Sequence, residues 1–113
     1  MSFYCVIKTE LSRRKYIIAA LAEMQKKGEI TSYEISKTKD KINVDRGGEV
    51  VTVSRINEKS NYEIGGIARP AREISDRMKQ LYAYESIKDN LPLDFEIAKE
   101  TEEAGEIVIM LKG

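Results

Sequence analysis

The sequence predicts an α+β fold, a ferredoxin-like antiparallel sheet with two helices on one face and an additional β-hairpin. Two segments repeat their apolar residues with the period of a helix, and the stretches between them alternate with the period of a strand. Polar turn segments separate those stretches in pairs, as in hairpins. Because each helix has one apolar stripe, both should cover the same face of one sheet. The 113 residues contain no linker or repeat, so we expect a single domain spanning 1–113.

The first strand and the first helix have distinct signals. Residues 3–9, FYCVIKT, form a short apolar run rich in aromatic and β-branched side chains, which predicts a buried strand. The helix that follows has Ser12 as its candidate N-cap. Gly28 is the candidate residue that ends this helix in a left-handed conformation.

The middle of the chain predicts two successive hairpins and then a helix. Strands are expected around 33–35 and 42–44, and again at 50–56 and 62–68. Gly65 and Gly66 predict a kink or bulge in the last of these strands. The second helix should start near Pro70, which fits a first helical turn, and continue to Asn90.

The end of the chain predicts a closing hairpin. Phe95 and Ile97 alternate as in a strand, the segment ETEEAGE has the composition of an acidic turn, and IVIML has that of a last strand.

Composition excludes several classes of function. Nineteen basic and nineteen acidic side chains cancel, so the chain lacks the net positive field that draws proteins to nucleic acids or anionic membranes. Six tyrosines are present, but the segment VVTVSRI has no aromatic residue where a base-stacking strand would need one, which disfavours nucleic-acid binding. The single Cys5 and the absence of a long apolar run point to a reducing, cytoplasmic setting without a membrane span.

The residue inventory also argues against catalysis. The chain has no histidine, the usual general base and a common zinc ligand, and it carries none of the standard nucleotide-binding or hydrolase motifs. Glutamates in the acidic segment offer oxygen ligands to a divalent cation, but a solvated turn is the favoured interpretation (Glu100, Glu102, Glu103 and Glu106). Cys5 lacks an activating base and is expected to be a small buried hydrophobe. We therefore expect no enzyme activity, no cofactor and no metal site.

Basic residues at both helix starts are the candidate ligand-binding residues. They are Arg13, Arg14 and Lys15 on the first helix and Arg69 and Arg72 on the second. Positive charge opposes the helix dipole there, so a compensating anion is expected. The anion is either an acidic side chain of the same fold or an external ligand. If both helix starts lie at the same end of the sheet, the four arginines converge and would suit a phosphorylated or nucleotide ligand.

Parts of the sequence resemble a known family. The pieces are the opening SFYCVIKTEL, NYEIGG after the central hairpin, and LYAYESIKDNLPLDFEIAKETEEAGEIVIML at the end. These are similar to a conserved domain of unknown function found in bacteria and archaea and, in cyanobacteria and red-algal plastids, as a hypothetical chloroplast reading frame. The resemblance implies a non-enzymatic partner of an AAA-type ATPase system and no catalytic residues.

Two hypotheses of function follow. The first is a small binding or adaptor module that makes protein–protein contacts through its sheet edge or open sheet face and forms a homo-oligomer. The second is a binder of a small phosphorylated or nucleotide ligand at the helix-start arginines.

Overall fold

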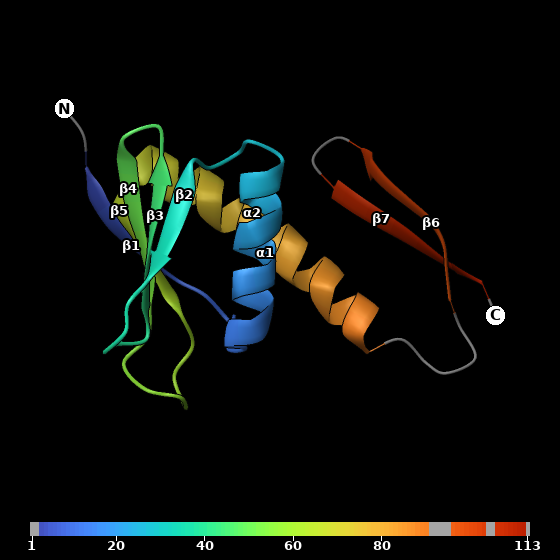
Figure 1. Ribbon diagram of the computed structural model, residues 1–113, viewed down its shortest axis with the longest axis horizontal. Helices are drawn as coiled ribbons and strands as arrows, with labels where there is room; N and C mark the ends of the chain where they lie inside the picture. Colours follow the sequence, from blue (N-terminus) through green and yellow to red (C-terminus); the bar gives the residue numbers. More distant parts are fainter. Residues whose placement is uncertain (1–2, 91–95, 104–105, 113) are drawn as a thin grey trace.

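The fold consists of seven strands and two helices in the part of the chain that the structure describes. A computed structural model describes residues 3–90, 96–103 and 106–112. The elements follow one another along the chain as in Figure 1: β1 (Tyr4–Lys8), α1 (Arg14–Lys26), β2 (Ser32–Ile35), β3 (Lys41–Arg46), β4 (Glu49–Ser54), β5 (Glu63–Ile67), α2 (Ala68–Asp89), β6 (Glu96–Glu103) and β7 (Glu106–Lys112). The predicted α+β class is confirmed.

The first five strands form one antiparallel sheet with the order β1-β5-β4-β3-β2. The two predicted hairpins, β2–β3 and β4–β5, are both present. Gly47 and Gly48 join β3 to β4 with φ of 60° and 94°, the positive values that a two-residue hairpin turn requires. This strand order does not confirm the ferredoxin-like core, and that finer assignment stays a prediction.

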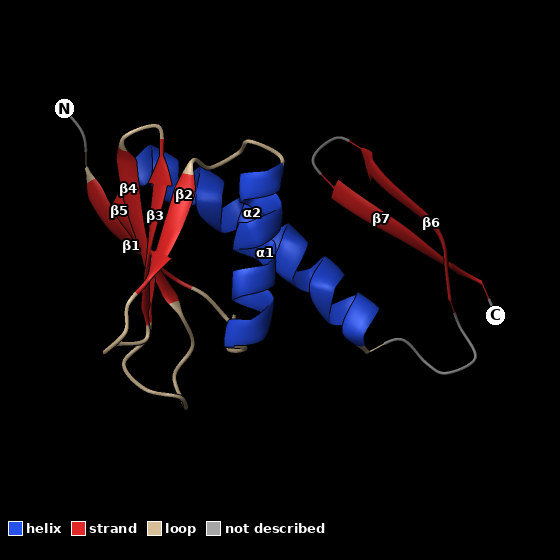
Figure 2. Cartoon of the chain, in the orientation of Figure 1, coloured by secondary structure: helices blue, strands red, loops and turns tan. Residues whose placement is uncertain are grey.

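Both helices cover one face of the five-stranded sheet (Figure 2). Side chains alternate along the strands, so Ile42 and Val44 of β3 and Val51 and Val53 of β4 are buried beneath the helices. The helices supply the other half of the core from single stripes (Tyr16, Ile17, Ala20, Leu21 and Met24 of α1, and Ala71, Ile74, Met78 and Leu81 of α2). The opposite face of the sheet carries no helix in the described part of the chain.

The first helix ends as predicted but starts one residue later than predicted. At the C-terminus, Gly28 has φ of 76°, its N–H donates to Gln25, and the Glu29 N–H donates to Met24. These two bonds form a Schellman motif. At the N-terminus the cap residue is Arg13 instead of Ser12, and no side chain of the cap residue bonds the helix.

The segment of the two adjacent glycines differs from its prediction. Gly65 and Gly66 pair with Val6 and Cys5 of β1 without a shift in register, so the expected bulge is absent from this pairing. The second helix then begins at Ala68, directly after β5, with Pro70 in its first turn. A strand that runs into a helix without a loop leaves no glycine-rich turn at the helix start.

The predicted closing hairpin is present: the last two strands pair with each other in a two-stranded sheet that is separate from the five-stranded one. Figure 1 shows this hairpin set apart from the five-stranded sheet, beyond the C-terminal half of α2. The predicted bounds of the acidic turn are wrong: Glu100, Glu102 and Glu103 lie in β6, and Glu106 begins β7. Phe95 lies outside the described residues. Neither described helix is long and apolar enough to cross a membrane.

Candidate functional site

The structure separates the two groups of basic residues that the sequence places at helix starts. At the first turn of α1, the Lys15 Nζ lies 2.6 Å from a carboxylate oxygen of Asp89, the last residue of α2. The start of α1 therefore lies beside the end of α2, while Arg69 and Arg72 lie at the other end of α2. The condition for a converging arginine surface is not met.

Most of these basic residues have acidic neighbours within the fold. Asp89 raises the pKa of Lys15, chiefly through their hydrogen bond, and Lys15 in turn lowers the pKa of Asp89. Arg69 pairs with Glu73 at 3.2 Å on the surface of α2. Arg14 is among the charges that favour the ionised form of Asp40. Lys15 and Arg69 thus form ion pairs within the fold, and Arg14 acts on Asp40 only through its charge.

A half-buried polar network, which the sequence analysis missed, connects the β2–β3 loop, the end of β4 and the start of β5. The Tyr62 hydroxyl donates to one Asp40 carboxylate oxygen at 2.7 Å, and the Arg55 Nε donates to the other. Arg55 also donates to the Ser12 carbonyl at 2.6 Å, and its guanidinium lies 4.5 Å from the centre of the Tyr62 ring. This network ties the start of α1 to the sheet.

The network determines the ionisation of Asp40. Burial alone would raise the pKa of this carboxyl, but the hydrogen bonds from Tyr62 and Arg55 outweigh it and the pKa is lowered. Burial and the same carboxylate raise the pKa of Tyr62. One signal in the sequence could have predicted this network. Tyr62, just before β5, is in phase with Ile64 on the core face, and a buried tyrosine hydroxyl needs a hydrogen-bond partner.

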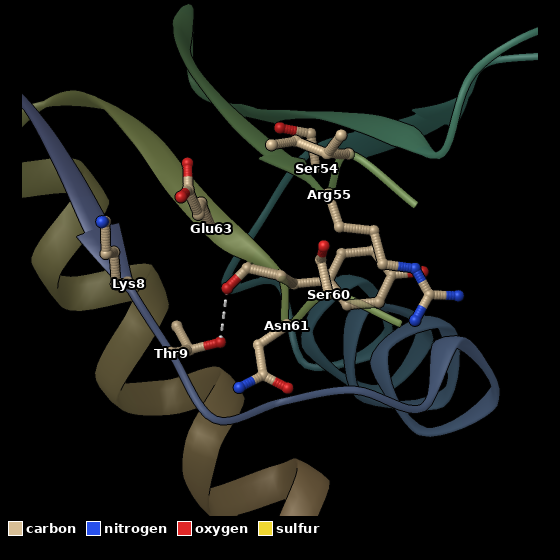
Figure 3. Close-up of a pocket in the computed structure, with 9 residues that line it drawn as sticks. Lys8, Thr9, Ser54, Arg55, Ser60, Asn61 and Glu63 are labelled. Atoms are coloured by element: carbon tan, nitrogen blue, oxygen red, sulfur yellow. Dashed lines mark hydrogen bonds between the residues drawn. The ribbon is translucent and has the colours of Figure 1, made fainter. Parts of the chain in front are cut away.

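A pocket of about 520 Å³ lies beside this network, between the end of β1 and the β4–β5 loop (Figure 3). Its polar side chains include Lys8 and Glu63, which lie opposite each other in the register of β1 and β5. Thr9 on its wall donates to the Tyr62 carbonyl at 2.7 Å. Arg55 also lines the pocket, but its guanidinium is committed to Asp40 and Ser12.

Strand β1 is an exposed edge of the sheet with unpaired backbone groups. The Thr9 N–H donates to the Tyr62 carbonyl, and the Ala68 N–H donates to the Phe3 carbonyl. Because bonded residues alternate in an antiparallel pair, the odd-numbered residues of β1 bond β5. The N–H and C=O groups of Tyr4, Val6 and Lys8 therefore point to the open edge, where no described strand pairs with them.

The open face of the sheet carries an apolar patch beside this edge. Tyr4 and Val6 of this face are 70% and 54% exposed. Tyr4 pairs with Ile67 of β5, and Val50 of β4, which is 55% exposed, lies in line with Ile67 when the β4–β5 register is continued by two residues. We call these four residues, Tyr4, Val6, Val50 and Ile67, the edge patch.

A second pocket, of about 410 Å³, lies on the helix side of the same edge. It is lined by β1 and by α2 (Cys5, Val6, Ile7, Arg72, Ser75, Asp76 and Lys79). Ser75 is buried, and its hydroxyl has no hydrogen-bond partner among the described residues. We call this the edge pocket. Within the described residues, no group of histidine, cysteine or acidic side chains is arranged to hold a metal ion.

A scan against known protein families, a search of curated proteins and a search of solved structures each find no match to this chain.

Proposed function

We propose that this protein is a non-catalytic protein-binding module that accepts an added β-strand along β1. The observation that carries the proposal is the open edge of β1, where three residues present unpaired N–H and C=O groups. Natural sheets protect such edges or use them for binding. An added strand would satisfy the backbone groups of Tyr4, Val6 and Lys8.

Features on both sides of the edge support an extended, alternating partner segment. On the open face, Tyr4 and Val6 offer apolar surface to every second side chain of an added strand. On the helix side, the edge pocket has room for the side chains in between. Backbone bonds would supply affinity in this mode of recognition, and the two sets of side chains would supply specificity.

The test uses a synthetic peptide with the sequence of residues 3–9, capped at both ends, as the added strand. Hydrogen exchange of the backbone amides is followed by NMR on the full chain with and without the peptide. We expect slower exchange at Val6 and Lys8, whose amides face the edge. Cys5 and Ile7 serve as internal controls, because their amides already bond β5.

A matched control peptide has proline in place of the central valine and so lacks the central N–H donor. It should protect the edge amides less than the parent peptide does. The exchange is measured at a chain concentration at which sedimentation shows a monomer, so that no second copy already covers the edge. If the parent peptide then leaves exchange at Val6 and Lys8 unchanged at millimolar concentration, β1 does not accept strands and the proposal is wrong.

Two other predictions from the sequence concern a partner protein and a ligand. The partnership with an AAA-type ATPase follows only from the family resemblance and stays a prediction. The phosphorylated or nucleotide ligand was to be held by converging arginines, and the separation of Arg13 and Arg14 from Arg69 and Arg72 removes the geometric argument for it.

A further inference from the structure

We infer that the strand accepted by β1 is β1 of a second copy of this chain, in an antiparallel pair with a two-fold axis through Val6. This inference rests on the proposed function and names its partner. The pair would join two five-stranded sheets edge to edge into one continuous sheet, with the helices of both copies on the same face.

The backbone fixes the register. Only even-numbered residues of β1 present groups to the open edge, so a symmetric pair must place even residues opposite even residues. With the axis at Val6, Tyr4 lies opposite Lys8 of the second copy and Val6 lies opposite Val6. All five residues of β1 are then paired, whereas a shift by two residues in either direction leaves part of each strand unpaired.

The side chains on the open face agree with this register. Antiparallel pairing places Lys8 of each copy opposite Tyr4 of the other on the open face, so each cation faces an aromatic residue and not a second cation. A parallel pair would instead place Lys8 directly beside Lys8 of the second copy, which is unfavourable. Val6 against Val6 would extend the edge patch of one copy into that of the other.

The helix side of the edge also suits a second copy. Cys5 and Ile7 of β1 point toward the helix layer and are only partly buried, although both pack against the core. In the pair, Cys5 lies opposite Ile7 of the second copy, so these side chains would occupy the edge pocket. Arg72, Asp76 and Lys79 on the pocket wall carry both signs of charge, so the two helix surfaces that approach each other are not of one sign.

The decisive experiment introduces opposite charges at the axis. We compare Val6→Lys, Val6→Glu and an equimolar mixture of the two by sedimentation equilibrium. Each variant alone places like charges opposite each other, and we expect its self-association to weaken by about tenfold or more relative to the wild type. The mixture places Lys beside Glu at the axis and should restore dimers, all of them mixed.

Val50→Lys and Val50→Glu are the matched controls. Val50 lies on the same face and is 55% exposed, against 54% for Val6, but it belongs to β4 in the middle of the sheet. Both controls should dimerise as the wild type does. Circular dichroism and melting curves verify that all four variants fold.

A strictly monomeric wild type, an equal loss of dimers in the Val6 and Val50 variants, or a mixture that stays monomeric would each overturn the inference. Failure here is distinguishable from failure of the proposed function. If the peptide of residues 3–9 protects the edge amides while the chain stays monomeric, β1 accepts strands but not those of a second copy.

Discussion

At the scale of single residues, the hydroxyl of Tyr62 is the clearest target for mutation. Tyr62→Phe removes the donor to Asp40 and leaves a half-buried carboxylate with one hydrogen bond fewer. We expect a loss of about 1–3 kcal/mol in the free energy of unfolding, measured with urea. Tyr33→Phe is the control, because no hydrogen bond of its hydroxyl is found among the described residues, and it should change stability little. Equal losses in both variants would contradict this role for Tyr62.

Asp40 should make the free energy of unfolding depend on pH in the acid range. Its pKa in the folded state is lowered from the ordinary value of 3.8, so the folded state favours the ionised form. The stabilisation is therefore complete above about pH 4 and is lost as the pH falls through the lower folded pKa. Asp40→Asn should destabilise the protein at neutral pH and should lose less stability than the wild type between about pH 5 and pH 2.

The comparison for that prediction is Asp76→Asn, which removes an exposed carboxylate that has no ion pair among the described residues. Its loss of stability in acid should match that of the wild type. If Asp40→Asn also follows the wild type throughout the acid range, the network does not couple Asp40 to folding.

The polar network also shows what the sequence could not predict at this scale. The sequence indicated that Tyr62 and Ile64 share the core face of β5, and Ile64 is fully buried. It gave no sign that Asp40, in a polar turn 22 residues earlier, would accept the Tyr62 hydroxyl. Such a contact depends on the register of β3, β4 and β5 together, which single-strand patterns do not encode.

At the scale of elements, helix α1 is capped by a residue from α2. The Tyr82 hydroxyl accepts hydrogen bonds from the backbone N–H groups of Arg13 at 3.0 Å and Ser12 at 3.4 Å. The Tyr82 ring also packs edge-on against Tyr16, with ring centres 5.4 Å apart. The N-terminus of the helix thus depends on a tertiary contact.

This capping predicts a loss of stability for one small substitution and almost none for another. Tyr82→Phe keeps the ring but loses the acceptor, and we expect a loss of about 1 kcal/mol in unfolding free energy. Ser12→Ala, which would cost about as much if Ser12 were the N-cap, should cost almost nothing. Chemical denaturation of the two variants decides whether Tyr82 or Ser12 caps the helix. A larger loss of stability from Ser12→Ala would show that the Ser12 side chain is the cap.

The elements themselves were largely predictable, but their assembly was not. Apolar periodicity identified both helices, and period-two alternation identified the hairpins β2–β3 and β4–β5. The separation of the helix starts follows from the antiparallel contact of α1 with α2, which the charge pattern at residues 13–15 cannot report. The edge position of β1 likewise follows from the strand order. It could not be predicted from the sequence, because an apolar run suits a buried strand and an edge strand alike.

At the scale of the whole molecule, the open question is whether the β6–β7 hairpin belongs to the same folding unit as the five-stranded sheet. The described core lies between Leu11 and Leu81, and neither edge strand of the large sheet pairs with β6 or β7. Asn90, by contrast, bonds the Tyr16 hydroxyl and the Ser86 carbonyl. β7 does contact α2, but we expect the cooperative unit to end just after Asn90.

A chain that ends after Asn90 should retain every ladder of the large sheet and unfold in one cooperative transition. We expect its Tm to fall by less than about 8 °C, the shift that roughly 1 kcal/mol produces in a domain of this size. A chain that ends after Ser86 also loses the contacts of Asp89 with Lys15 and Tyr16, so its Tm should fall further. If the longer truncated chain melts without a cooperative transition, the hairpin is part of the core domain, and the single unit spanning 1–113 is the correct description.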